Sequence, residues 1–245
     1  KDYTVLAWDY RGYGKNQVPA DLDSVSFAGF AKDMRALLDS YGTEQAILIG
    51  HSMGSQVLFE FYRHFPERVK AMVMLCGTYE NPFTLITRAK WFQKGLIRTA
   101  RSLMRVSKPM EKVFRPLMRL PIAIDISYQV GANPDLAPRY YLEALFDHVC
   151  SIDFRVVLKS FEAMTSQSAR DLLPHISVPT FVIGGEKDGL IPPKRIREME
   201  AGIPNAMARV YSECTHLAMI EKRDEVLSDI AHFFEKNALS ERTSV

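Results

Sequence analysis

Short apolar runs alternate with helical patterns along most of the chain. Five runs have the length and composition of buried strands, and each is followed by a turn: residues 5–8, 46–49, 71–75, 180–183 and 208–211. Residues 27–38 place apolar side chains at positions 27, 30, 31, 34, 37 and 38, which is the stripe of an amphipathic helix. Strands that alternate with helices predict an α/β fold, with a mostly parallel sheet and helices on both of its faces.

The alternation stops between residues 80 and 168, where helical patterns dominate. We therefore expect a core made of residues 1–79 and 169–245, interrupted by a helical cap insertion of residues 80–168. Open parallel sheets bind their ligands beyond the carboxyl ends of the strands. The loops at that edge, together with the cap, are where we expect the functional site.

Basic residues are concentrated at 88–119, where Glu111 is the single acid and apolar residues recur every three or four positions. This pattern is typical of a segment that lies on an anionic lipid surface or receives an amphiphilic substrate. It is equally typical of a helix that packs its apolar side on the core and leaves a basic face in solvent. Pro109 and Pro116 are expected to interrupt the helix.

Composition limits the classes of protein to consider. The 245 residues, 47% of them hydrophobic, suffice for one large core, and a net charge of +2 indicates no general attraction to nucleic acid. No run of eighteen apolar residues predicts a membrane span. Cys76, Cys150 and Cys214 are odd in number and lack close spacing, so we expect core residues rather than disulfides or a zinc site, which favours a cytoplasmic location.

The sequence Gly50-His51-Ser52-Met53-Gly54 joins the apolar run 46–49 to a helical pattern. A strand, a sharp turn and a helix with serine at the apex form a nucleophile elbow. We expect a strained serine, and glycines two residues to either side because side chains there would bring strand and helix into collision. The helix N-terminus, with the backbone N–H of Met53, would face an oxyanion.

A serine hydroxyl needs a base within hydrogen-bond reach, and the base needs an acid that orients it. Among six histidines, His216 alone follows a predicted strand at the sheet edge that carries Ser52. Asp188 lies in the glycine-rich loop after residues 180–183 and is the natural acid. Glu186 is a near competitor for this role and Glu80 a remoter one.

The chain order Ser52, Asp188, His216, together with the elbow, resembles the α/β-hydrolase fold. The segment 9–14, Asp-Tyr-Arg-Gly-Tyr-Gly, is similar to the turn after the fourth strand of that family. The resemblance covers essentially the whole chain. It implies a serine hydrolase that cleaves a carboxylic ester through an acyl-enzyme intermediate, with neither a metal nor an organic cofactor. The expected substrate contacts are His51, Leu190 and Leu217.

Members of that family normally carry three strands before the one equivalent to residues 5–8, and the loop after the third supplies a second backbone N–H to the oxyanion hole. Neither is found in this sequence, so we expect an N-terminally truncated piece of a longer protein, with the Met53 N–H as its one confident donor. Loss of one donor typically lowers turnover about 100- to 1000-fold.

Methionines and aromatic residues in the insertion favour a small-molecule ester with an apolar acyl group. A thioester, carbon–carbon bond cleavage on a dione, or acyl transfer to an alcohol would use the same three residues. A ligand-binding protein without turnover would keep the same fold.

Overall fold

The computed structural model describes residues 3–82 and 107–239. Its sheet has four parallel strands in the spatial order β1-β2-β3-β4. The strands are β1 Ala46–His51, β2 Val69–Leu75, β3 Thr180–Gly185 and β4 Ala206–Tyr211. Four of the five predicted strands are therefore confirmed, and so is their parallel arrangement.

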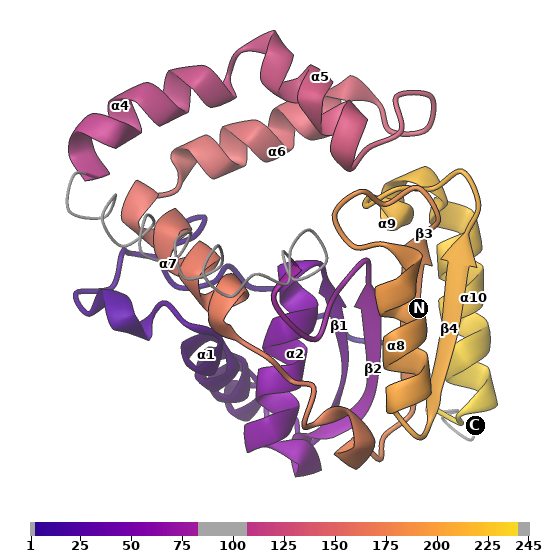
Figure 1. Ribbon diagram of the computed structural model, residues 1–245. Helices are drawn as coiled ribbons and strands as arrows, with labels where there is room; N and C mark the ends of the chain where they lie inside the picture. The colour runs from indigo at the N-terminus through magenta and orange to yellow at the C-terminus, as the bar shows by residue number, and fades with distance from the viewer. Residues whose placement is uncertain (1–2, 83–106, 240–245) are drawn as a thin grey trace.

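Helices cover both faces of the sheet, as predicted (Figure 1). One face carries α1 Phe27–Ser40, α2 Met53–His64 and α8 Pro193–Gly202, and the other carries α9 Ala218–Glu221 and α10 Arg223–Lys236. Side chains alternate between the two faces along each strand. Met72 and Met74 of β2 accordingly join the core cluster under α1 and α2, while Val73 joins the cluster under α10.

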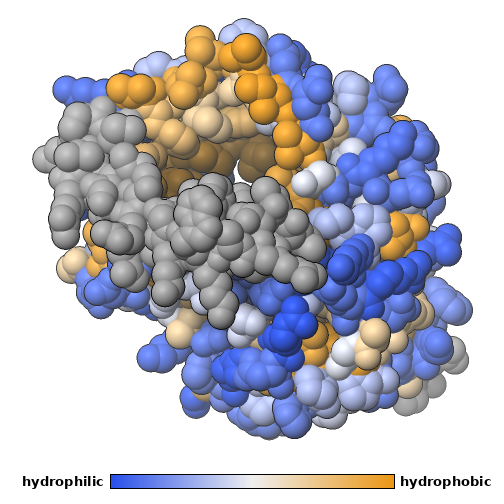
Figure 2. Space-filling model, viewed as in Figure 1, coloured by the Kyte–Doolittle hydropathy of each residue, from blue (hydrophilic) through white to orange (hydrophobic). Residues whose placement is uncertain are grey.

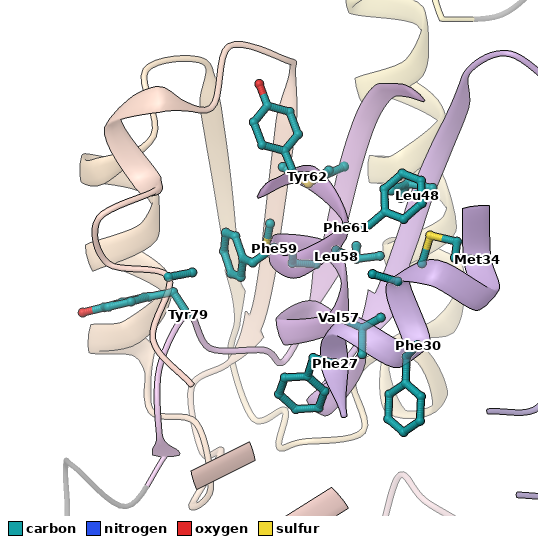
Figure 3. Close-up of a cluster of buried hydrophobic side chains, with 14 of the residues drawn as sticks. Phe27, Phe30, Met34, Leu48, Val57, Leu58, Phe59, Phe61, Tyr62 and Tyr79 are labelled. Carbon is teal, nitrogen blue, oxygen red and sulfur yellow. The ribbon is translucent and has the colours of Figure 1, made fainter. Parts of the chain in front are cut away.

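The larger core cluster joins α1 and α2 to the sheet. Figure 3 shows Phe30 and Met34 of α1 in one cluster with Val57 and Phe61 of α2 and Leu48 of β1. Phe30, Val57 and Phe61 are fully buried, and each such side chain contributes about 1.5–3 kcal/mol relative to exposure. The helix that carries Ser52 at its start is thereby fixed against the sheet.

Among the described residues, four helices lie between β2 and β3, and we call them the cap helices: α4 Ser107–Met118, α5 Pro121–Val130, α6 Arg139–Ser151 and α7 Phe154–Ser166. The outgoing and returning segments run side by side, because Glu80 and Ser168 form an antiparallel bridge and Ala169 N–H donates to Tyr79 O at 2.7 Å. In Figure 1, α4, α5 and α6 lie beyond the carboxyl ends of the strands. Short 3-10 helices complete the described elements: Leu22–Ser24, Pro66–Arg68 and Leu173–His175.

Residues 5–8 are not a strand, so that prediction is wrong. Val5 is 84% exposed, and within the described part of the chain β1 pairs only with β2. A strand requires a hydrogen-bonded neighbour, and composition alone does not show whether one is present. The segment that follows is nevertheless ordered by contacts with α1, since the guanidinium of Arg11 donates to both carboxylate oxygens of Asp33.

The interruption expected at Pro109 and Pro116 is also wrong, because α4 contains both residues. Pro109 lies in the first turn, where its missing N–H would have no partner within the helix. Pro116 stands two residues before the end at Met118, so few helical hydrogen bonds are lost. Residues 88–106, the larger part of the predicted basic segment, lie outside the described residues.

Cys76, Cys150 and Cys214 are free and buried, as predicted. Within the described ranges, no helix has the length and apolar character needed to cross a bilayer.

Candidate active site

Ser52 stands between the end of β1 at His51 and the start of α2 at Met53. Its backbone has φ +52° and ψ −116°, outside the regions that a side chain normally permits. The strained serine expected from the elbow is therefore confirmed. Ser52 N–H donates to Leu75 O at 2.9 Å, which ties the turn to the end of β2.

The two glycines of the elbow are not equivalent. A Cβ at Gly50 would lie 2.8 Å from the backbone carbon of Gly54 and 3.0 Å from the backbone nitrogen of Ser55. At Gly54, a Cβ would approach only the hydroxyl of Tyr10, at 3.7 Å. The collision expected at both positions is confirmed at Gly50 and wrong at Gly54.

His216 lies between the serine and an acid. Its Nε2 is 2.8 Å from Ser52 Oγ, and its Nδ1 is 2.8 Å from Asp188 Oδ2. A carboxylate can only accept, so the proton belongs on Nδ1 and leaves Nε2 free to accept from the serine hydroxyl. This is the arrangement in which an imidazole can take a proton from an attacking hydroxyl.

Asp188 is held by its own loop. Its second oxygen, Oδ1, accepts the backbone N–H groups of Leu190 and Ile191, both at 2.8 Å. Asp188 is 4% exposed and His216 is 7% exposed, whereas Ser52 is only partly buried. His216 and Asp188 are thus shielded from water, which strengthens their interaction, while the serine stays accessible.

The two competing acids lie elsewhere. Glu186 is exposed. Glu80 pairs with the guanidinium groups of Arg170 and Arg195, at 3.1 and 2.7 Å. Asp188 is therefore the carboxylate that the fold brings to His216.

Met53 is the first residue of α2, and the N–H groups of a first helical turn have no acceptor within the helix. The positive end of the helix dipole is at the same place. An oxygen that becomes negative beside Ser52 would meet both.

His51 lies against the base rather than away from the site. Its Nε2 is 2.9 Å from the backbone oxygen of His216, and the two rings are 4.9 Å apart. Burial, and next the neighbouring His216, lower the pKa of His51 to about 4. The neutral ring must carry its proton on Nε2, since a carbonyl only accepts, and it thereby holds the backbone of the base.

Leu190 and Leu217 flank the acid and the base differently. Leu190 is 46% exposed, and it would contact a Cβ at Gly131, at the end of α5, at 3.3 Å. Leu217 packs instead against the buried cluster of the cap that includes Ile124 and Leu142. Leu190 is accessible beside the site, whereas Leu217 joins the cap to the loop of the base.

Apolar side chains are exposed along the cap helices α4 and α5. They are each between 39% and 61% exposed: Val113, Leu117, Leu120, Ile122, Ile126 and Val130. Figure 2 shows apolar surface over these helices and around a hollow beneath them. The end of α5 reaches the loop of the acid, because Gly189 N–H donates to Val130 O at 3.0 Å. An apolar surface therefore extends along the cap to the neighbourhood of Asp188.

Three potential metal ligands, on His51, Cys76 and His216, lie within 4.8 Å of one another among the described residues. Metal binding requires a thiolate, and burial raises the pKa of the Cys76 thiol to about 12. Both nitrogens of His216 are already hydrogen-bonded. This donor set is a poor fit for a metal ion.

One further residue holds the loop of His216 and was not found from the sequence. The buried carboxylate of Glu221 accepts from the backbone N–H and the hydroxyl of Thr215, which precedes His216. The sequence offered one indication: Glu221 directly follows the apolar run Leu217-Ala218-Met219-Ile220, at a position where another apolar residue is usual.

Comparison with known proteins agrees with this architecture. The model of the alpha/beta hydrolase fold family matches residues 1–223. Bifunctional epoxide hydrolase 2 of Mus musculus is 25% identical over an alignment 254 positions long, which covers 91% of this chain and 45% of that protein. The chain thus spans about half the length of the first curated relatives that it matches. A 2-hydroxy-6-oxononadienedioate/2-hydroxy-6-oxononatrienedioate hydrolase of Paraburkholderia phymatum is 29% identical over 231 residues, 89% of this chain and 72% of that protein.

Solved structures share the fold. A thermophilic esterase from Thermogutta terrifontis superposes with a TM-score of 0.70 at 23% identity, covering 94% of this chain and 78% of that one. MenH from S. aureus superposes with a TM-score of 0.73 at 18% identity, covering 94% and 82%. With the family model matched over most of its length, the chain belongs to the alpha/beta hydrolase fold family.

Proposed function

We propose that the protein is a serine hydrolase that cleaves a carboxylic ester. The observation that carries the proposal is the continuous hydrogen-bond chain from Ser52 through His216 to Asp188. Ser52 Oγ attacks the ester carbonyl while His216 Nε2 takes its proton, and Asp188 stabilises the imidazolium. The Met53 N–H stabilises the oxyanion. His216 then protonates the leaving alcohol. Water attacks the acyl-enzyme while His216 takes its proton, the bond between the acyl carbon and Ser52 Oγ breaks to release the carboxylic acid, and His216 returns the proton to Ser52 Oγ.

The identity of the nucleophile distinguishes epoxide hydrolysis from the acyl-transfer reactions among those named for relatives. Attack by a serine oxygen on an epoxide would give an ether. An ether has no carbonyl carbon, so water activated by His216 could not release the product from the serine. Attack on an ester gives another ester, which water can hydrolyse. A serine at this position therefore favours acyl substrates over epoxides.

The apolar surface along α4 and α5 favours an apolar acyl group. We propose that residues 80–168 act as a cap that binds this group, with Leu190 and Leu217 beside it. Contact of 88–119 with a lipid surface is a further proposal. In α4 and the residue after it, Arg115 and Arg119 pair with Glu111 and Asp147, which supports the alternative of a solvated basic face there.

The test compares nitrophenyl acetate, butyrate and octanoate, and measures labelling by a fluorophosphonate probe. We expect kcat/KM to rise with chain length and the probe to label wild type but not Ser52→Ala. A preference for acetate would contradict the apolar acyl group. A folded wild-type protein that binds ligand yet resists the probe would contradict catalysis and favour a ligand-binding role.

A second candidate is carbon–carbon bond hydrolysis on a dione, which the similarity to the Paraburkholderia phymatum hydrolase favours. Turnover of a dione in excess of any nitrophenyl ester would support it. Two other reactions use the same three residues. Acyl-CoA substrates test for thioester cleavage, and product analysis with an added alcohol tests for acyl transfer.

A further inference from the structure

We propose that Glu221 is a positioning residue that holds the loop of His216 to the cap, so that the cap helps to set the position of the base. The inference rests on the proposed function, because it assigns Glu221 a role in placing the base of that reaction. It adds a residue that acts on the base without touching the serine or the substrate.

The Glu221 carboxylate faces hydrogen-bond donors from two segments. Its Oε2 accepts Thr215 N–H at 2.6 Å, and its Oε1 accepts the Thr215 hydroxyl at 2.6 Å and Asn133 N–H at 2.7 Å. Glu221 is 7% exposed, and within the described residues no Lys, Arg or His pairs with it. Burial of a charged group is costly unless it is hydrogen-bonded. Three neutral donors therefore stabilise the buried carboxylate.

Asn133 belongs to the loop between α5 and α6 of the cap. Its side-chain Nδ2 donates to Glu213 O at 3.0 Å, in the loop that carries the base. Glu213 has φ +57°, a conformation that a residue with a side chain adopts only under constraint. The amide of Asn133 supplies one such constraint, so a single cap residue contacts Glu213 directly and is linked to Thr215, next to the base, through the Glu221 carboxylate.

The same cap loop lies against the base and the acid. A Cβ at Gly131 would come within 3.4 Å of the Cβ of His216, and Gly189 N–H, next to Asp188, donates to Val130 O at 3.0 Å. The imidazole must keep bonds to both Ser52 and Asp188, and a shift of about 1 Å at a reacting group lowers turnover about 100-fold. Loss of the Glu221 contacts would free the base to move by such an amount.

The isosteric variant Glu221→Gln is the sharpest perturbation. An amide offers one oxygen and one NH2, whereas two backbone N–H groups point at the two oxygens of Glu221. Whichever way the amide turns, one N–H faces a donor. We expect kcat for a nitrophenyl ester to fall about 10- to 100-fold with KM within a few-fold of wild type. The exposed Glu225, four residues on and at the surface of α10, provides the matched control Glu225→Gln.

Proton NMR supplies a readout that needs no turnover. We expect the proton between His216 Nδ1 and Asp188 to resonate far downfield in wild type, and we expect Glu221→Gln to shift or broaden that signal while Glu225→Gln leaves it unchanged. If Glu221→Gln does not fold, Thr215→Val and Thr215→Ser replace it. The first removes the hydroxyl donor and should lower kcat, whereas the second keeps the donor and should restore it.

Three results would overturn the proposal. One is a folded Glu221→Gln protein with wild-type kcat and an unchanged downfield proton. Another is a lower melting temperature without any change in kcat or in that proton, which would show a purely structural role. The third is equal kcat in Thr215→Val and Thr215→Ser. Wild-type protein that shows the downfield proton but hydrolyses no ester would contradict the proposed function, and the effect of Glu221→Gln on that proton would then decide by itself whether Glu221 positions His216.

Discussion

Replacement of Gly50 by alanine should damage the protein far more than the same change at Gly54. The nearest backbone carbon would lie 2.8 Å from the new methyl group at Gly50, about 0.6 Å closer than the 3.4 Å at which ordinary contact begins. The atoms it would meet belong to the backbone of the first turn of α2, which cannot rotate away. At Gly54 the new methyl group would meet only the Tyr10 hydroxyl at 3.7 Å.

The size of the effect follows from this geometry. Overpacking of this kind typically destabilises by about 1–3 kcal/mol. For a chain of this length that corresponds to a fall in melting temperature of about 2 to 12 °C. The first turn of α2 also carries Met53, so its displacement moves the N–H group aimed at the oxyanion. A shift of this order should lower kcat about 10- to 100-fold.

Gly54→Ala is the matched control, because it adds the same methyl group to the same turn. Alanine is the better helix former, and we expect stability unchanged or raised by up to about 1 kcal/mol. Thermal unfolding and nitrophenyl ester turnover of both variants measure the difference. The reasoning would be refuted if Gly50→Ala matched wild type in both assays, or if Gly54→Ala were as impaired as Gly50→Ala.

Three further substitutions test the neighbours of the serine. Asp188→Asn should fold, because its amide oxygen can accept the two backbone N–H groups of its loop, but its NH2 would face His216 Nδ1 and place the proton on the wrong nitrogen. We expect kcat to fall about 1,000- to 10,000-fold, and a loss below tenfold would contradict the assigned role. The pKa of His51, lowered to about 4 by burial, means that the unfolded chain binds a proton first as the pH falls. Stability should therefore be full above about pH 7 and decrease toward pH 4 by up to about 3 kcal/mol. Denaturant unfolding of His51→Gln, which keeps a donor but does not titrate, should show a weaker decrease, and an identical pH dependence would contradict the assignment. Gly189→Ala would place a methyl group 2.4 Å from Val130 O, so we expect separation of this loop from the cap, a lower melting temperature and a raised KM for long-chain esters. An unchanged KM would show that this contact does not shape the acyl site.

The sheet and the elbow could be predicted because they are encoded locally. Runs such as residues 180–183 are apolar on both sides, as a doubly covered parallel strand must be, and a glycine-flanked serine between a strand and a helix has few other uses. Because the carboxyl ends of parallel strands lie at one edge, chain order alone indicated that Asp188 and His216 would be near Ser52. Chain order could not give the distances from His216 to Ser52 and Asp188, nor the ring nitrogen of His216 that carries the proton.

The supports of the base could not be predicted, since they depend on contacts between distant segments. Asn133 and Glu221 are 88 positions apart, and the sequence around either residue gives no sign that the other is its partner. The contact of His51 with the base could not be predicted either, because the elbow orients only the serine, whereas the ring of His51 is placed by the loop of His216. The strand expected at residues 5–8 failed for the same reason, because pairing is a property of the neighbour as well as of the run.

The three catalytic candidates are positioned by different means, and this difference predicts where they are vulnerable. Ser52 is fixed by the strained turn between β1 and α2, and Asp188 by backbone N–H groups of its own loop. His216 depends on residues outside its loop, with His51 holding its backbone oxygen and Glu221 holding Thr215 before it. Changes in the cap should therefore act on the reaction mainly through the base. Substitutions in the 131–133 loop should lower kcat for short and long esters alike, whereas substitutions confined to the exposed apolar residues of α4 should change KM for long esters only.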